Sequence, residues 1–201
     1  LAKSEIYAFL DDDAIVDLNW LKEISLYFKN HPDIGAILGK IEPLDDTHLL
    51  SRTRQQIYNK RHDLYTDQKF INFLKNKYRL KINSTVHLSN RISGGNFAIR
   101  KNSLEKIGGL PVALRLSSDT VVSDKLLLAR IAIGYNQKMI IYHEHNTSYY
   151  VLYKNNFLEG RDWVKIQKSK NVTNLKLFFQ IFGTFLMVPF KIKHFPQVLN
   201  A

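Results

Sequence analysis

The stretch Ile6–Asp13 reads IYAFLDDD, a short apolar run that ends in three aspartates. A continuous apolar run of this length, bounded by polar residues, is typical of a buried strand. The carboxylates then lie where the strand ends, and open α/β sheets bind their ligands at the carboxyl ends of their strands. Grouped carboxylates are unfavourable unless a cation or a donor-rich ligand neutralises them. The stretch therefore predicts an α/β fold with a ligand or cation site at one edge of the sheet.

The same aspartates also suit a simpler role. Aspartate is common in turns and at helix N-caps, and an apolar helical pattern, Trp20–Phe28, follows closely. Hard divalent cations prefer carboxylate oxygens, and Mg²⁺ often joins one or two carboxylates to substrate phosphates. From these residues alone, a polar turn and a metal site are equally supported.

The rest of the chain alternates between helical and strand patterns, which is typical of an α/β fold. Further helices are expected within the polar, basic stretch 45–84, at Leu104–Ile107 and at Thr120–Ile133. Further strands are expected at Ile34–Gly39, after Gly94-Gly95, and at Met139–Tyr142. The predicted fold is a mixed sheet flanked by helices.

The composition limits the function. The 201 residues have a formal net charge of +11 and contain no cysteine, which excludes disulfide scaffolds and thiolate metal sites. A basic balance favours polyanionic partners such as nucleotide phosphates, anionic lipids or nucleic acid. The basic residues of 52–81 form either a solvated helical face or a binding surface. A non-catalytic basic module that binds nucleic acid or membrane phosphates is therefore the alternative function, although no nucleic-acid motif is present.

Four motifs, in this order, resemble those of family 2 glycosyltransferases, which have the GT-A fold. They are Asp11-Asp12-Asp13 (DXD) with Asn19-Trp20-Leu21; Ser93–Arg100 with Glu105–Leu110; Thr120–Asp124 with Arg130 and Gly134-Tyr135; and His143-Glu144-His145 with Leu152, Lys154, Gly160 and Arg161. The resemblance covers residues 4 to 165 and implies a GT-A-like (Rossmann-like) sheet. Ser123 departs from the family, which has glutamate before its catalytic aspartate. The family's N-terminal base-binding unit is not seen, so the chain is expected to be the later part of a longer protein that binds nucleotide sugar weakly by itself.

The resemblance implies an inverting, metal-dependent transfer of a sugar from a nucleotide-diphosphate sugar to a hydroxyl of a glycan or lipid-linked acceptor. A divalent metal, Mg²⁺ or Mn²⁺, would stabilise the charge that grows on the leaving diphosphate. The resemblance assigns Asp11 to the donor ribose and the metal, and Asp13 to the metal. In an extended segment, these i and i+2 side chains share one face. Asp12 is expected to face away and order the turn.

The acceptor hydroxyl needs a base within hydrogen-bond reach, and the resemblance assigns that role to Asp124. The alternative for Asp124 is the N-cap of an apolar helix. His143 and His145 share one strand face, and at least one of them, with His143 favoured, is expected to complete the metal shell or contact the diphosphate.

The remaining site residues are expected around the donor and the acceptor. Gly94 and Gly95 let the backbone approach a ligand closely, or simply form a tight turn. Asn96 would offer its amide to sugar hydroxyls. Arg161 would bind the diphosphate and Trp163 would stack on the acceptor sugar. For these last two, a surface arginine and a core tryptophan are equally supported.

The C-terminal part carries a separate signal. Leu177–Phe190 is nearly all apolar and has lysines on both sides, but it is shorter than the 20 or so residues that a membrane span needs. It fits an interfacial helix or a buried terminal helix. We therefore expect a glycosyltransferase part, 1–170, and a membrane-associated part, 171–201. The protein would be cytoplasmic, at the inner face of the cell membrane, with no nucleic-acid partner.

Overall fold

The structure, a computed structural model, describes residues 4–45, 47, 49–83, 85–111, 118–144, 148–169 and 172–174. The chain divides into two units, Leu1–Ser148 and Tyr149–Ala201, which are described separately. The predicted boundary after residue 170 stays a prediction. The apolar segment Leu177–Phe190 lies outside the described residues. Among the helices that the structure describes, none combines the length and the apolar character needed to cross a bilayer.

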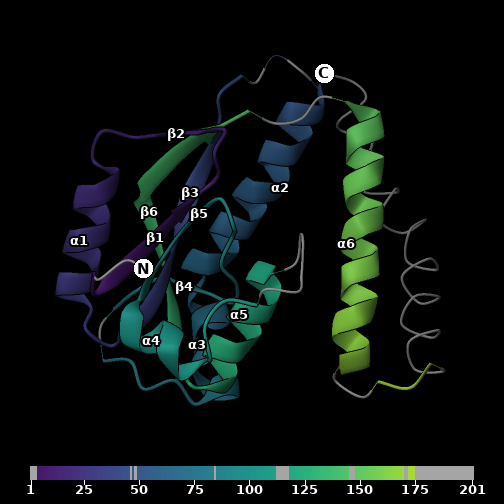
Figure 1. Cartoon of the computed structure of the whole chain (residues 1–201). Helices are drawn as coiled ribbons and strands as arrows, with labels where there is room; N and C mark the ends of the chain where they lie inside the picture. The colour runs from purple at the N-terminus through teal and green to yellow at the C-terminus, as the bar shows by residue number, and fades with distance from the viewer. Residues whose placement is uncertain are drawn as a thin grey trace. The chain divides into compact units, whose positions relative to one another are not determined.

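The first unit is built on a mixed sheet (Figure 1). Its strand order is β1-β5-β3-β6-β2, with β4 also paired to β6. The strands are β1 Ile6–Leu10, β2 Ala14–Val16, β3 Ile34–Pro43, β4 Leu88–Ser89, β5 Asn96–Arg100 and β6 Ala132–His143. β3 and β6 are parallel, whereas β5 is antiparallel to both β1 and β3. β1, β3 and β6 therefore run in the same direction and end at the same edge of the sheet.

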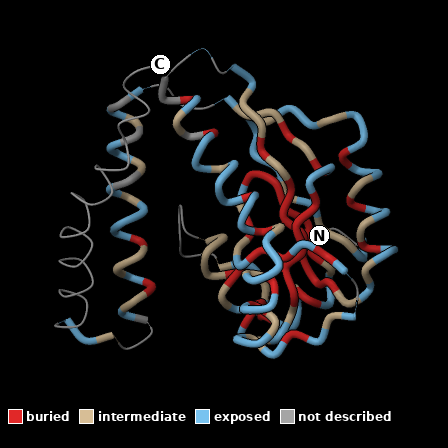
Figure 2. The backbone as a smooth tube through the Cα atoms, turned by 180° about the vertical axis from the view of Figure 1, so that it is seen from behind, coloured by how far each residue is buried: buried red, intermediate tan, exposed pale blue. Residues whose placement is uncertain are grey.

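Helices flank this sheet, so the predicted mixed α/β fold is confirmed. They are α1 Trp20–Asn30, α2 Leu49–Thr66, α3 Gln68–Tyr78, α4 Lys101–Lys106 and α5 Ser118–Leu128; α6, Tyr149–Ser169, belongs to the second unit. α1 buries Trp20, Ile24 and Phe28, which are four residues apart and share one helix face. α1 and α2 lie on opposite sides of the sheet (Figure 1). The buried residues are concentrated in the strands between them (Figure 2).

The predicted helix Thr120–Ile133 is too long at its C-terminal end. α5 stops at Leu128, and β6 already begins at Ala132. Arg130 adopts a left-handed conformation with φ of 59°, and the N–H of Ile131 donates to the carbonyl of Leu126 at 2.9 Å. This is the Schellman type of helix end, which usually has glycine where Arg130 stands here.

Asn96 joins β3, β5, β6 and α1. Its side chain is fully buried, and its amide donates to the carbonyls of Lys40 and Met139, each at 2.9 Å. Its Oδ1 accepts a hydrogen bond from the indole N–H of Trp20 at 2.9 Å. The β3–β6 pairing shifts register between Gly39 and Lys40. The Asn96 amide satisfies two carbonyls at this shift.

Candidate metal site

The candidate site lies at the edge of the sheet where β1 and β6 end. Asp11 follows directly after β1, and His143 is the last residue of β6. The two strands run in the same direction, so both residues reach the same edge. This is the edge at which the sequence predicts a ligand site.

A tight turn brings Asp13 to the same place. The N–H of Ala14 donates to the carbonyl of Asp11 at 3.3 Å, which closes a turn between β1 and β2. β2 then pairs with β6, and Ala14 lies opposite His143. The turn and the β2–β6 pairing, rather than an extended segment, bring the Asp11 and Asp13 side chains together.

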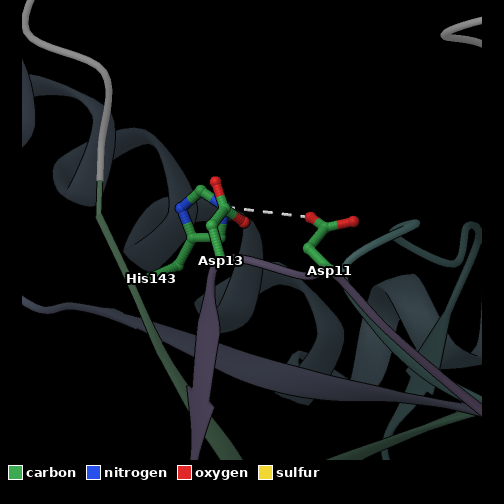
Figure 3. Close-up of side chains that lie close together, drawn as sticks. All are labelled: Asp11, Asp13 and His143. Atoms are coloured by element: carbon green, nitrogen blue, oxygen red, sulfur yellow. Dashed lines mark ion pairs between the residues drawn. The ribbon is translucent and has the colours of Figure 1, made fainter.

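Asp11, Asp13 and His143 form one group (Figure 3). The Nε2 atom of His143 lies 3.0 Å from Oδ1 of Asp13 and 3.8 Å from Oδ2 of Asp11. One potential ligand atom from each residue lies within 4.8 Å of the other two. Ligands of a single divalent ion lie at about 2.0–2.6 Å from it, and hence within about 5 Å of one another. Two carboxylates and one imidazole fit Mn²⁺ or a similar divalent ion, and they fit Mg²⁺ where phosphate oxygens complete the shell.

Two further residues, Asp12 and His145, belong to the same sequence motifs as the group. Asp12 lies in the turn, is exposed and is not a member of the group, in agreement with its expected role. His145 lies outside the described residues.

The charges around Asp11 favour a cation. Burial raises the pKa of the Asp11 carboxyl above its ordinary value, and His143 acts in the opposite direction. The carboxylates of Asp13, Asp12 and Asp119 each raise that pKa further. A divalent ion would relieve this repulsion and favour the charged form of Asp11.

Gly95 lies against the Asp11 carboxylate. The register of β1 and β5 places Leu10 opposite Asn96, and therefore Gly95 beside Asp11. A Cβ atom at Gly95 would collide with Oδ2 of Asp11 and lie 3.0 Å from its Cγ. The close approach expected at Gly95 is therefore to a site carboxylate. A Cβ at Gly94 would meet open space, and the ligand contact of Gly94 stays a prediction.

The predicted sugar contact of Asn96 is wrong. Its side chain is fully buried, and both ends of its amide are hydrogen-bonded inside the fold, to Trp20, Lys40 and Met139. An amide in this position has no free group to offer to a sugar hydroxyl. Its role is to hold the β3–β6 register shift beside the site.

Asp124 lies inside α5, which begins by Ser118, so the N-cap alternative for Asp124 is wrong. The preceding residue, Ser123, is buried. Its hydroxyl accepts from the N–H of Ile92 at 2.9 Å and donates to the carbonyl of Asp119 at 2.6 Å. Ser123 thus ties the start of α5 to the segment that leads to Gly95. The catalytic role of Asp124 stays a prediction.

Asp119 is a further acidic residue near the site that the sequence patterns did not predict. It lies in the first turn of α5, and its charge acts on Asp11. The signal that could have found it is a second aspartate on the same segment, five positions before Asp124.

Arg161 and Trp163 both lie on α6, in the second unit. The Arg161 guanidinium lies 3.5 Å from the buried carboxylate of Asp162. Trp163 is half-buried. The predicted diphosphate and sugar contacts of these two residues stay predictions.

Comparison with known proteins leaves the family open. No protein-family model matches the chain, and no curated protein is similar enough to count as a relative.

Proposed function

We propose that the protein is an inverting, metal-dependent glycosyltransferase of the GT-A fold. It would transfer a sugar from a nucleotide-diphosphate sugar to a hydroxyl of a glycan or lipid-linked acceptor. The observation that carries the proposal is the grouping of Asp11, Asp13 and His143 at the edge where β1 and β6 end. The ordered set of motifs that resembles family 2 glycosyltransferases supports it further.

Two carboxylates and a neutral imidazole would hold the metal. Asp11 and Asp13 supply negative oxygens, and His143 supplies Nε2, which must be unprotonated to bind an ion. When bound, a divalent ion stabilises the negative charge of a departing diphosphate as a Lewis acid. Gly95 leaves free the space that the Asp11 carboxylate occupies.

The acceptor hydroxyl needs a base, and we assign that role to Asp124. Its carboxylate would accept the hydroxyl proton as the oxygen attacks the sugar. Asp119 is the competing candidate, because it lies on the same helix and its charge acts on Asp11. The proposed place of action is the cytoplasmic face of the cell membrane, where a lipid-linked acceptor would lie.

The test is metal-dependent release of nucleoside diphosphate from a panel of nucleotide sugars, measured with the protein and a mixture of glycan and lipid-linked acceptors. We expect release from at least one donor with Mn²⁺ or Mg²⁺, and its loss with a chelator. Asp13→Asn should abolish release, whereas Asp12→Asn, which makes the same charge change one residue away, should keep most of it. Release that is absent for every donor, or that is unaffected by chelation, would contradict the proposal.

A further inference from the structure

One face of α6 carries exposed aromatic rings. Tyr150, Tyr153 and Phe157 have exposed fractions of 73%, 73% and 64%. Their spacing of three and four residues places them on the same side of the helix. Among the aromatic side chains that the structure describes in the first unit, only Phe73 is exposed, with an exposed fraction of 53%. Exposed rings are therefore concentrated on this helix.

Basic residues lie beside these rings. Lys154, Arg161, Lys165 and Lys168 are all exposed. At 3.6 residues per turn, they form a stripe that runs along the rings on the same side of α6. We call this combined surface the aromatic–basic face; it consists of Tyr150, Tyr153, Lys154, Phe157, Arg161, Lys165 and Lys168.

Of the two acidic residues of α6, Asp162 offsets part of the charge of this face, and Glu159 lies away from it. Asp162 is buried, and its Oδ1 lies 3.5 Å from Arg161 and 3.7 Å from Lys165. Glu159 is nine positions after Tyr150, which places it on the opposite side of the helix. The aromatic–basic face is therefore a positively charged surface with apolar rings.

We propose that the aromatic–basic face of α6 docks on an anionic lipid surface. Tyrosine and other amphipathic aromatic residues favour the headgroup level of a bilayer, and a helix with such rings and with lysines beside them lies in the interface plane. Lysine and arginine reach headgroup phosphates while their aliphatic stems cover apolar surface. The whole chain, at +11, adds to this attraction.

A lipid surface fits this face better than nucleic acid does. Proteins that stack bases on aromatic rings hold the strand in a positively charged groove. A single helix face is convex, so it suits a flat, deformable headgroup layer. The inference does not depend on the proposed enzymatic function, because binding to lipid is measured without catalysis.

The experiment is flotation of the full chain with vesicles of phosphatidylcholine alone or mixed with phosphatidylglycerol. Two double variants of α6 are compared with wild type. Tyr153→Ser/Phe157→Ser removes two exposed rings, and Lys154→Gln/Lys168→Gln removes two positive charges. Phe73→Ser on α3 is the matched control for an exposed ring, and Lys22→Gln/Lys29→Gln on α1 is the control for charge. All these side chains are exposed, so the variants are expected to fold, which circular dichroism verifies.

We expect wild type to float with the mixed vesicles and much less with phosphatidylcholine. Each α6 variant should lower the partition coefficient roughly tenfold or more, and high salt should lower it further for wild type. Both controls should partition nearly as wild type does. Flotation of the α6 variants equal to that of wild type would overturn the proposal. The proposal would also be overturned if wild type did not float but bound random-sequence DNA, and the α6 variants lost this binding.

Discussion

Gly95 and Asp11 lie side by side across the β1–β5 pair, and the Asp11 carboxylate occupies the space that a side chain at Gly95 would need. Asp11 is one of the three potential metal ligands, so a side chain at Gly95 would meet one carboxylate of the site. Gly95 has no left-handed backbone that would itself require glycine. The Asp11 carboxylate, and not the backbone conformation, is therefore what a side chain at Gly95 would encounter.

Gly95→Ala should weaken Mn²⁺ binding about tenfold or more, since partners that orient metal ligands typically contribute that much. The added methyl group displaces Asp11 from the position beside His143. Titration of the protein into Mn²⁺, followed by the electron paramagnetic resonance signal of the free ion, measures the change. Gly94→Ala is the matched control, because a Cβ there meets open space. Equal Mn²⁺ affinity in the two variants would contradict this account of Gly95.

Asn96→Ala should lower the free energy of unfolding by about 3 kcal/mol or more. It removes two buried hydrogen bonds and one partly buried one, each worth about 1 kcal/mol. The Lys40 and Met139 carbonyls and the Trp20 indole N–H are left without that partner. Urea unfolding measures the loss, with the exposed Asn90→Ala as control. If the two variants were equally stable, the structural role of Asn96 would be wrong and its amide would be available to a ligand.

The sequence predicted the position of the site better than the way in which it forms. The apolar run before Asp11 and the run before His143 both marked strand ends, and local patterns show such ends. The convergence of Asp13 on His143 depends on β2, which is only three residues long and too short to give a pattern. A turn at these aspartates was one of the alternatives, but its pairing with β6 has no local signal.

The two larger errors have different causes, one long-range and one local. Asn96 follows Gly94-Gly95 at the start of a strand, which made a ligand contact reasonable. Its burial results from the β3–β6 register shift, which involves residues far away in the sequence. Arg130 ends α5 in a conformation that usually requires glycine, so no local signal separated that helix from β6.

Stability should fall as the pH is lowered, because of His62. This side chain on α2 is buried and stacks on Tyr135, with ring centroids 5.1 Å apart. Burial, with a smaller contribution from Lys40, lowers the pKa of His62 from 6.5 to about 4. Between these two values the unfolded chain binds more protons than the folded one, so the free energy of unfolding rises with pH.

The contribution of neutral His62 to the free energy of unfolding is complete above about pH 6.5 and is lost as the pH falls toward 4. Between about pH 7 and about pH 5, the free energy of unfolding should decrease by roughly 2 kcal/mol because of His62. His62→Phe keeps a ring against Tyr135 and removes the titrating group. Urea unfolding at the two pH values should show a smaller decrease in this variant than in wild type. An equal decrease would mean that His62 is not the source.

Asp124→Asn should lower sugar transfer by about 10²–10⁴-fold, the usual contribution of a positioned base. Mn²⁺ binding should stay unchanged, because Asp124 is not a member of the metal-binding group. Initial rates of nucleoside diphosphate release, measured beside Asp119→Asn, test the assignment. Near-normal turnover in Asp124→Asn would show that Asp124 is not the base. If Asp119→Asn lost transfer instead, Asp119 would be assigned that role.

The most direct test of the metal site is Mn²⁺ titration of wild type, Asp13→Asn, His143→Gln and Asp12→Asn, followed by the electron paramagnetic resonance signal of free Mn²⁺. Asp12→Asn removes one negative charge in the same turn but no member of the group. We expect wild type to bind one Mn²⁺ ion, Asp12→Asn to bind it nearly as well, and Asp13→Asn and His143→Gln to lose at least about tenfold in affinity. No Mn²⁺ binding by wild type, or an equal loss in Asp12→Asn and Asp13→Asn, would contradict a metal site formed by Asp11, Asp13 and His143.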